Sequence, residues 1–414
     1  MKSKRDSIVI LAITGSLHGM IHTLSLFLSP VNADVARYFN FDSISSVTSF
    51  KTSYLIVYAM SNLLFGALSS RISARLILGF GMLLNACAVL AFRFVPPSGA
   101  VAMHVLWMLA AVGGGVYHPV ANAFITRKFP DRKGWALGIT GMGSGIGFAF
   151  GPLLTGFLSV GMGLPWQSIA LVFGSLGLSC GVAALIWLQD EAEMPDAPKP
   201  VQVMEAPKRS ARSFLGLSTP LWMFLAFITL IAGTRDFSMW SILDISDFYL
   251  GEVFGGNANT AWYLFVMYLP GIFFQPLAGI FSDKLGRKRL AFISLLVYGS
   301  AIASLAVLPP AWLLMSYFVM GAAQSASTPV IEALVADFAT PKTRGMIFGV
   351  YITVLMGMGA FGPLLAGLFL DAFGRTLAAF QLWMFLLGSA VVIGGIGMLF
   401  SGKVISALKL VKSR

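Results

Sequence analysis

The sequence predicts an all-helical membrane protein with twelve transmembrane helices, and three observations support this fold class. Of the 414 residues, 57% are apolar and only 11% are charged, whereas a soluble domain is about 25% charged. The mean hydropathy of +0.82 exceeds what a soluble chain of this length can bury. Apolar stretches of about 20 residues, enough to cross a bilayer as a helix, recur along the chain. We therefore expect lipid to surround much of the molecule.

Each predicted span is a mostly apolar stretch of helical length. In chain order the spans cover 8–29, 45–68, 76–95, 100–126, 136–158, 166–188, 219–246, 260–281, 290–308, 311–337, 346–369 and 378–401. The first stretch is long enough to span, and no small-residue cleavage site follows it, so we interpret it as a span rather than a cleaved signal peptide.

Lysine and arginine are distributed unevenly along this pattern. The N-terminus, the connections after the even-numbered spans and the C-terminus hold 23 of the 28. Because basic residues gather on the cytoplasmic side of membrane proteins, we expect both termini in the cytoplasm. The net charge of +11 then reflects topology and an affinity for anionic lipid, and nucleic acid is not an expected partner.

The two halves of the chain resemble each other, which indicates duplication of a six-span unit. Pro119–Ala123 (PVANA) matches Pro329–Ala333 (PVIEA) at an offset of 210 residues. The following glycine and proline residues match at an offset of 211: Gly151, Pro152 and Gly156 with Gly362, Pro363 and Gly367. We predict two six-helix bundles, 1–188 and 214–414, joined by a proline-rich cytoplasmic linker over 189–213. Duplicated bundles suit alternating access to a site near the bilayer midplane.

The segment Gly279–Leu290, GIFSDKLGRKRL, resembles the cytoplasmic signature of the major facilitator superfamily. The resemblance implies a monomeric secondary transporter in the bacterial inner membrane. It also implies a gating latch, for which the candidates are Gly279, Asp283, Gly286, Arg287, Lys288 and Arg71. Asp337 lies close to the cytoplasmic face and is interpreted as a gate or a helix-end group. The first-half equivalent, GALSSRISARLI, keeps Arg71 but has Ser70 where the signature has an acid.

Two further motifs resemble known patterns. Gly147-x-x-x-Gly151-Pro152-x-x-x-Gly156 is similar to a family motif linked to exporters that exchange substrate for protons. Its recurrence at Gly362, Pro363 and Gly367 equally fits close helix packing and a kink. His18-x-x-x-His22 together with Tyr117-His118-Pro119 resembles the fosmidomycin-resistance-type exporters.

Ionisable residues at membrane depth are costly and usually functional. Arg235 and Asp236 lie near the middle of span seven, and Arg235 is the candidate for gripping an anionic group because its guanidinium binds carboxylate or phosphonate in a bidentate manner. Neighbours on a helix point about 100° apart, so we expect these two side chains not to pair with each other. Asp236 either titrates during transport or neutralises Arg235.

Candidates for proton coupling are Glu332, Asp236, His18 and His22. Glu332 is the only glutamate well inside a predicted span, and its alternative role is an ion pair with a residue such as Arg235. His18 and His22 lie one turn apart, and histidine titrates near neutral pH. They also fit a hydrogen-bonded interior pair. Two ligands alone make a weak metal site, so no metal is predicted.

Other polar residues are assigned by position. The candidates for lining the substrate cavity are Tyr117, His118, Asn122, Trp240 and Gln275. For Trp240 and Gln275 the alternative is packing without substrate contact. Acidic residues near the outer ends of spans, such as Asp244 and Asp247, are expected to be solvated or to act in gating, as are Asp34 and Arg37. Lys51 is expected to reach the membrane interface.

Several classes of function are not supported. The chain has no Gly-x-x-x-x-Gly-Lys-Ser/Thr phosphate-binding motif, no catalytic triad and no metal-ligand spacing, so we expect no enzyme and no cofactor. Cys87 and Cys180 are interpreted as buried small side chains. The expected partners are a small-molecule substrate, protons and the bilayer, with efflux of an anionic or zwitterionic solute favoured. The alternative is a related protein that has lost transport and acts as a sensor or assembly partner.

Overall fold

The computed structural model describes residues 2–68, 72–129, 132–188, 213–214, 217–256, 259–336 and 344–410, and almost all of these are helical. The first half contains α1 (Lys2–Leu26), η1 (Ser29–Val31), α2 (Asn32–Tyr38), α3 (Ile44–Leu68), α4 (Ala74–Ala91), η2 (Phe92–Phe94), α5 (Ala100–Gly115), α6 (Tyr117–Lys128), α7 (Lys133–Gly156), the π-helical turn η4 (Phe157–Gly161) and α8 (Trp166–Trp187). The second half contains the strand pair β1 (Ser213–Phe214) and β2 (Leu217–Ser218), then α9 (Thr219–Phe254), α10 (Thr260–Tyr268), α11 (Gly271–Leu285), α12 (Arg287–Val307), α13 (Pro310–Ala336), α14 (Arg344–Ala372) and α15 (Leu377–Leu410).

All twelve predicted spans coincide with a helix or with two consecutive helices. Span four divides into α5 and α6 after a run of three glycines, and Pro119 in the first turn of α6 has no N–H to continue the ladder. Span eight divides into α10 and α11 at Pro270 for the same reason. Span seven is longer than predicted and runs to Phe254. The predicted linker, 189–213, lies outside the described residues except for Ser213.

Eight helical segments among the described residues are long and apolar enough to cross a membrane. The four remaining spans correspond to α3, α9, α10 with α11, and α13. All four carry buried polar or charged side chains, for example Lys51 on α3, Arg235 on α9 and Thr260 on α10, and the span made of α10 and α11 is also interrupted at Pro270. Their lower hydropathy follows from facing the interior of the protein, where polar groups are tolerated.

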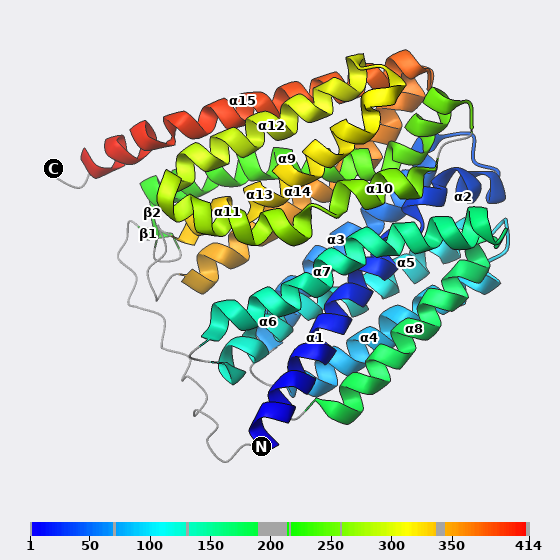
Figure 1. Ribbon diagram of the computed structural model, residues 1–414, viewed down its shortest axis with the longest axis horizontal. Coiled ribbons are helices and arrows are strands. Elements are labelled where there is room, and N and C mark those ends of the chain that lie inside the picture. The colour runs from blue at the N-terminus through cyan, green and yellow to red at the C-terminus, as the bar shows by residue number, and fades with distance from the viewer. Residues whose placement is uncertain are drawn as a thin grey trace.

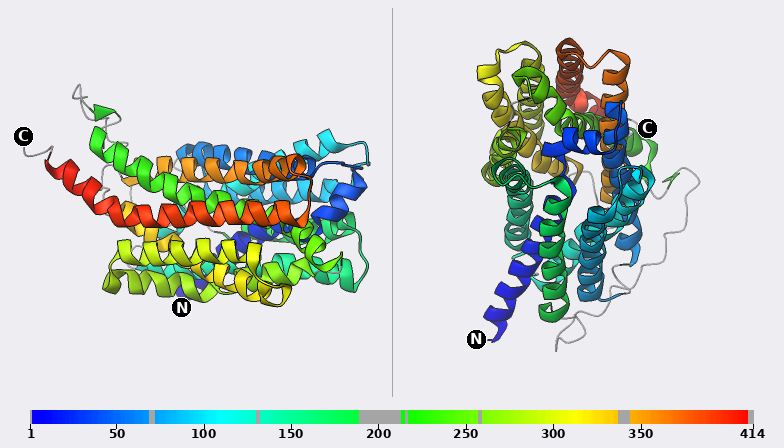
Figure 2. Two further views of the ribbon diagram at one scale, coloured as in Figure 1. Left: turned by 90° about the horizontal axis from the view of Figure 1, so that it is seen from above. Right: turned by 90° about the vertical axis from the view of Figure 1, so that its right-hand side faces the viewer.

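The helices form two groups. Figure 1 shows most helices of the first half, blue through cyan to the green of α8, in the lower part of the molecule, and those of the second half, from the green of α9 through yellow to red, above them. One cluster of buried apolar side chains comes almost entirely from residues 10–188 and another from residues 224–398. Both termini lie at one end, and α2 lies at the opposite end (Figures 1 and 2).

Cys87 is exposed, so its predicted burial is wrong: it lies on the outward face of α4, where an apolar side chain meets lipid.

A glycine seam, Gly143, Gly147 and Gly151, joins α7 to α1. A Cβ at Gly143 would collide with the carbonyl of Gly15, and one at Gly147 would collide with the carbonyl of Gly19. At Gly151 a Cβ would lie 3.1 Å from the Cα of Thr23. Helices can approach this closely only where side chains are absent.

Replacing Gly147 with Val is expected to force α7 away from α1 and to destabilise the fold by about 1–3 kcal/mol, the usual cost of overpacking. The measurement is the thermal unfolding midpoint of the detergent-purified protein. Gly141→Val is the matched control on the same helix, because nothing lies within 4 Å of a Cβ at Gly141. Equal midpoints for the two variants would contradict the seam.

The duplicated glycine–proline motif has the same packing role in both halves. Gly151 lies against Thr23 of α1, and Gly362 lies against Phe237 and Ser241 of α9. The glycine that follows the proline in each motif, Gly156 or Gly367, instead faces the other half.

A Cβ at Gly156 would meet Ala261 of α10, and one at Gly367 would meet Ser45 and Thr48 of α3. Each motif therefore permits close contact within its own half and then across the interface. Pro152 and Pro363 lie inside α7 and α14.

Candidate functional site

The first polar centre lies in the second half, around Arg235 of α9. Its guanidinium donates from Nε and Nη2 to Oδ1 of Asp236, at 2.8 and 2.6 Å, and from Nη1 to the hydroxyls of Ser327 and Thr328 on α13, both at 3.1 Å. The expectation that Arg235 and Asp236 do not pair is wrong. The two Cβ atoms do diverge, but the long arginine side chain folds back over the short carboxylate.

This arrangement nearly saturates the guanidinium. Nε gives one hydrogen bond, Nη1 gives two and Nη2 gives one, so four of the five N–H donors of arginine are engaged. Arg235 is 2% exposed and Asp236 is 9% exposed. A buried ion pair of this kind is costly to break on one side only.

Further polar groups surround the pair. Glu332 of α13 and Tyr351 of α14 lie within electrostatic range of Arg235. The hydroxyls of Tyr268 and Tyr298 lie within electrostatic range of Asp236, and both are buried without a hydrogen-bond partner among the described residues.

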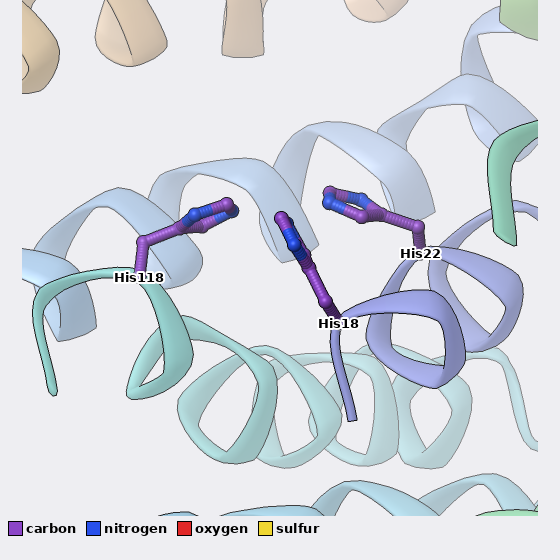
Figure 3. A group of neighbouring side chains, drawn as sticks. All are labelled: His18, His22 and His118. Carbon is purple, nitrogen blue, oxygen red and sulfur yellow. The ribbon is translucent and has the colours of Figure 1, made fainter. Parts of the chain in front are cut away.

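The second polar centre lies in the first half and consists of three histidines (Figure 3). His18 and His22 come from α1 and His118 comes from the first turn of α6. One nitrogen of each ring lies within 4.8 Å of the corresponding nitrogens of the other two. The sequence motifs contained all three residues, but the prediction did not bring His118 together with the other two.

Aromatic rings and two hydrogen bonds hold this centre in place. The ring of Tyr117 stacks on His18 with centroids 4.6 Å apart, and its hydroxyl donates to the carbonyl of Thr14 at 2.8 Å. Nδ1 of His18 donates to the carbonyl of Thr140 on α7 at 2.9 Å. Because a carbonyl only accepts, this bond places the proton of a neutral His18 on Nδ1 and leaves a lone pair on Nε2.

The two centres occupy equivalent places in the duplicated halves. The offset of 210 that relates Pro119 to Pro329 also relates Tyr117 and His118 to Ser327 and Thr328. Tyr117 and His118 contact His18 of the first span, whereas Ser327 and Thr328 bind Arg235 of the seventh. In each half, the residues before the matching proline, Pro119 or Pro329, thus lie against the first span of that half.

Phe148 of α7 connects the two centres. Its ring stacks on His22 with centroids 4.1 Å apart and on Tyr268 of α10 with centroids 4.9 Å apart.

The remaining predicted cavity residues, Trp240, Asn122 and Gln275, lie outside both centres. Trp240 packs against the apolar clusters of both halves, whereas Asn122 and Gln275 are exposed and take no part in the contacts that define either centre.

Polar contacts between the halves gather at the end of the molecule opposite the termini, and we call them the outer contacts. Asn32 donates from Nδ2 to the carbonyl and to Oδ1 of Asp244, at 2.8 and 3.2 Å. The backbone N–H of Ala33 donates to Oδ2 of Asp247 at 2.8 Å. Both aspartates are thereby held between the halves. Asp244 is 2% exposed, so the expectation of solvation is wrong for Asp244, and a gating role stays a prediction for both.

Asp371 at the end of α14 makes the third outer contact. Its carboxylate accepts from the backbone N–H groups of Ile44 and Ser45, both at 2.9 Å, and so caps the N-terminus of α3 in the other half. It also accepts from Nε of Arg375 at 2.9 Å. Sequence reasoning missed Asp371 because it lies just beyond the predicted span, where an acidic residue is ordinarily solvated.

Lys51 does not reach the membrane interface, contrary to expectation. It is 4% exposed and its ammonium donates to the carbonyl of Ser25. The rings of Trp107 and Trp240 lie 5.3 and 6.0 Å from Nζ, so cation–π attraction stabilises the buried charge.

Asp34 and Arg37, the other two charged residues considered near the outer side, form an exposed ion pair with each other on α2.

The signature segment forms the turn between α11 and α12, with Gly279 and Asp283 in α11. Gly286 has a φ of +87°, a conformation that favours glycine. Arg287 donates from Nη1 to the carbonyl of Ala333 at 2.9 Å, and Lys288 lines an open groove beside it. These contacts lie within the second half. Arg71, the remaining latch candidate, and Asp337 lie outside the described residues.

The chain resembles proteins of known family in both sequence and fold. It is 27% identical over 247 residues to the multidrug resistance protein MdtG of Serratia proteamaculans, a match that covers 58% of this chain and 57% of that relative. The MdtG of Dickeya zeae is 28% identical over 275 residues, 64% of each chain.

Solved structures with this fold include a bacterial homolog of the human lysosomal transporter Spinster in an inward-facing conformation, with a TM-score of 0.77, 14% identity and coverage of 97% of both chains. The nucleoside transporter NupG has a TM-score of 0.74, 14% identity and coverage of 95% of this chain and 99% of that one. The profile of the Major Facilitator Superfamily matches residues 11–257 and 236–407. The chain therefore belongs to the Major Facilitator Superfamily.

Proposed function

We propose that the protein is a secondary transporter that exports a small zwitterionic or anionic organic solute in exchange for protons. The observation that carries this proposal is the buried Arg235–Asp236 pair, which offers one positive and one negative partner side by side. The names of the relatives, multidrug resistance proteins, support the export direction. Membership of the superfamily supports alternating access.

The Arg235–Asp236 pair accounts for the exchange of substrate for protons, because both compete for the same two side chains. The carboxylate or phosphonate of a substrate takes the place of Asp236 on the guanidinium of Arg235, since both groups accept the same fork of donors. The cationic group of a zwitterion then binds the released carboxylate of Asp236. A proton competes with that cationic group for the same carboxylate, so proton binding on one side expels the substrate and the reverse occurs on the other.

Glu332 is proposed to hold the proton between turnovers. It lies within electrostatic range of both Arg235 and Asp236, so its charge changes the balance of the pair. The two carboxylates repel each other when both are ionised, so a proton held by Glu332 favours the ionised form of Asp236.

The orientation of the cycle follows from the charge distribution of the loops. We propose a bacterial inner membrane with both termini in the cytoplasm. The outer contacts then close the periplasmic side, and opening toward the periplasm requires Asn32, Ala33 and the N-terminus of α3 to leave their aspartate partners. Transport by a single chain suffices, because one chain contains both halves.

Flux into proteoliposomes tests this function. An acidic lumen is expected to drive accumulation of a zwitterionic solute from a panel of small carboxylates and phosphonates, and Glu332→Gln is expected to remove the dependence on the pH gradient because its amide takes up no proton. Glu252→Gln is the matched control, since Glu252 is exposed at the end of α9. Accumulation only with an alkaline lumen would contradict exchange, and the absence of flux for every solute would favour a sensor or assembly partner.

A further inference from the structure

Three of the four histidines of the first half form a cluster that the exchange described above does not use. His18, His22 and His118 present one ring nitrogen each to a common point, with all three nitrogens within 4.8 Å of one another. They come from two different helices, and Figure 3 shows the three rings turned toward each other. Three neighbouring imidazoles at membrane depth are costly unless something binds them.

His18 has the arrangement of a metal ligand. Its Nδ1–H donates to the carbonyl of Thr140, and its Nε2 is buried without a hydrogen-bond partner among the described residues. The side chain is 9% exposed. Histidines that bind metals commonly donate their second nitrogen to a carbonyl in this way, which fixes the tautomer and directs the lone pair at the ion.

We propose that His18, His22 and His118 bind one divalent transition-metal ion, with zinc as the representative of the class, and leave a fourth position open. Imidazole nitrogens suit zinc, copper, nickel and iron, whereas magnesium and calcium prefer oxygen ligands. This inference does not depend on the proposed function, because binding of the ion requires neither transport nor protons.

The geometry needs only a small closure. Zinc–nitrogen bonds of about 2.1 Å in a tetrahedron place the nitrogens about 3.4 Å apart. Starting from separations of at most 4.8 Å, rotation of the imidazoles about their side-chain bonds brings them together. The Tyr117 and Phe148 rings that stack on His18 and His22 restrict this motion to the plane of the stacks and so keep the rings directed at the common point.

The charge of the site indicates what occupies the fourth position. The three-residue cluster contains no carboxylate, and three neutral imidazoles leave the ion with its full charge of about +2 in a region of low dielectric. An exchangeable anionic ligand at the open position compensates this charge. The bound ion would then be the first half's counterpart of Arg235, since the two centres occupy equivalent places in the repeat.

Direct zinc binding tests the proposal. Full-length protein purified in detergent through a tag without histidine is titrated with zinc in competition with a fluorescent zinc chelator. We expect one zinc per chain, and we expect His118→Ala and His22→Ala each to weaken binding at least tenfold. The matched control is His104→Ala, because the ring nitrogens of His104 contact the hydroxyls of Ser49 and Ser53 instead, and zinc affinity should be unchanged.

Cobalt provides a second readout that needs no variant. Cobalt bound by wild-type protein should show the intense visible absorption of a four-coordinate site and lose it when zinc is added. The absence of one-to-one zinc binding by the wild type would overturn the proposal. So would unchanged affinity in a folded His118→Ala or His22→Ala protein, or a cobalt spectrum of six-coordinate, solvent-ligated ion.

Discussion

An Arg235→Ala variant is expected to lose both transport and much of its stability. The substitution leaves Asp236 buried without its partner, and removal of one member of a buried ion pair typically costs about 3–5 kcal/mol. It also frees the hydroxyls of Ser327 and Thr328, which accept from the guanidinium. The measurements are the thermal unfolding midpoint in detergent and the flux of the best solute in proteoliposomes.

A double variant separates the two effects. Arg235→Ala with Asp236→Ala removes both charges, so no unpaired carboxylate is left and most of the stability should return. Flux should stay absent, because the partner for the anionic group is still missing. Recovery of flux in the double variant would show that the pair is only structural, and a single variant as stable as the wild type would contradict the ion pair itself.

An Asp371→Ala variant is expected to open the outer end of the protein. It removes the acceptor for two backbone N–H groups at the start of α3, and loss of such a helix cap typically costs about 1 kcal/mol. Because the capped helix lies in the other half, this cost falls only on the state in which the outer contacts are closed. The population of the open state should rise roughly fivefold.

Spin labels at the outer end measure this shift. Asp42→Cys and Glu252→Cys, introduced after Cys87→Ser and Cys180→Ser, place one label on each half at exposed positions. Asp371→Ala should increase the fraction of long inter-label distances. Asp34→Ala is the control, because Asp34 pairs with Arg37 on its own helix; an equal shift in both variants would argue against the cap.

The helices were predictable from the sequence because apolar length alone determines where a chain crosses a membrane. The breaks in spans four and eight were harder to predict, although Pro270 and the glycine run before Val116 mark both of them. Hydropathy also detects the interior spans least well, since α9 and α13 carry the polar side chains that the site needs.

The site was predictable as a set of residues but not as a set of contacts. Arg235, Asp236, His18 and His22 stood out because charge and titratable groups are rare inside spans. Their pairing depends on side-chain conformation, as the folded-back arginine shows. The meeting of His118 with His18 depends on how closely α1 and α6 pack, which hydropathy does not reveal.

The ring of Phe148 has a thermodynamic consequence. It stacks on His22 in one half and on Tyr268 in the other, so both stacks exist together only while the two halves hold their present relation. A ligand that binds the histidine centre and moves the His22 ring disturbs one of these stacks. Such a ligand therefore changes the relative free energies of the arrangements that the two halves can adopt. By linkage, movement of the halves must alter the affinity of that centre by the same factor, which makes Phe148 a point where occupancy and conformation become cooperative.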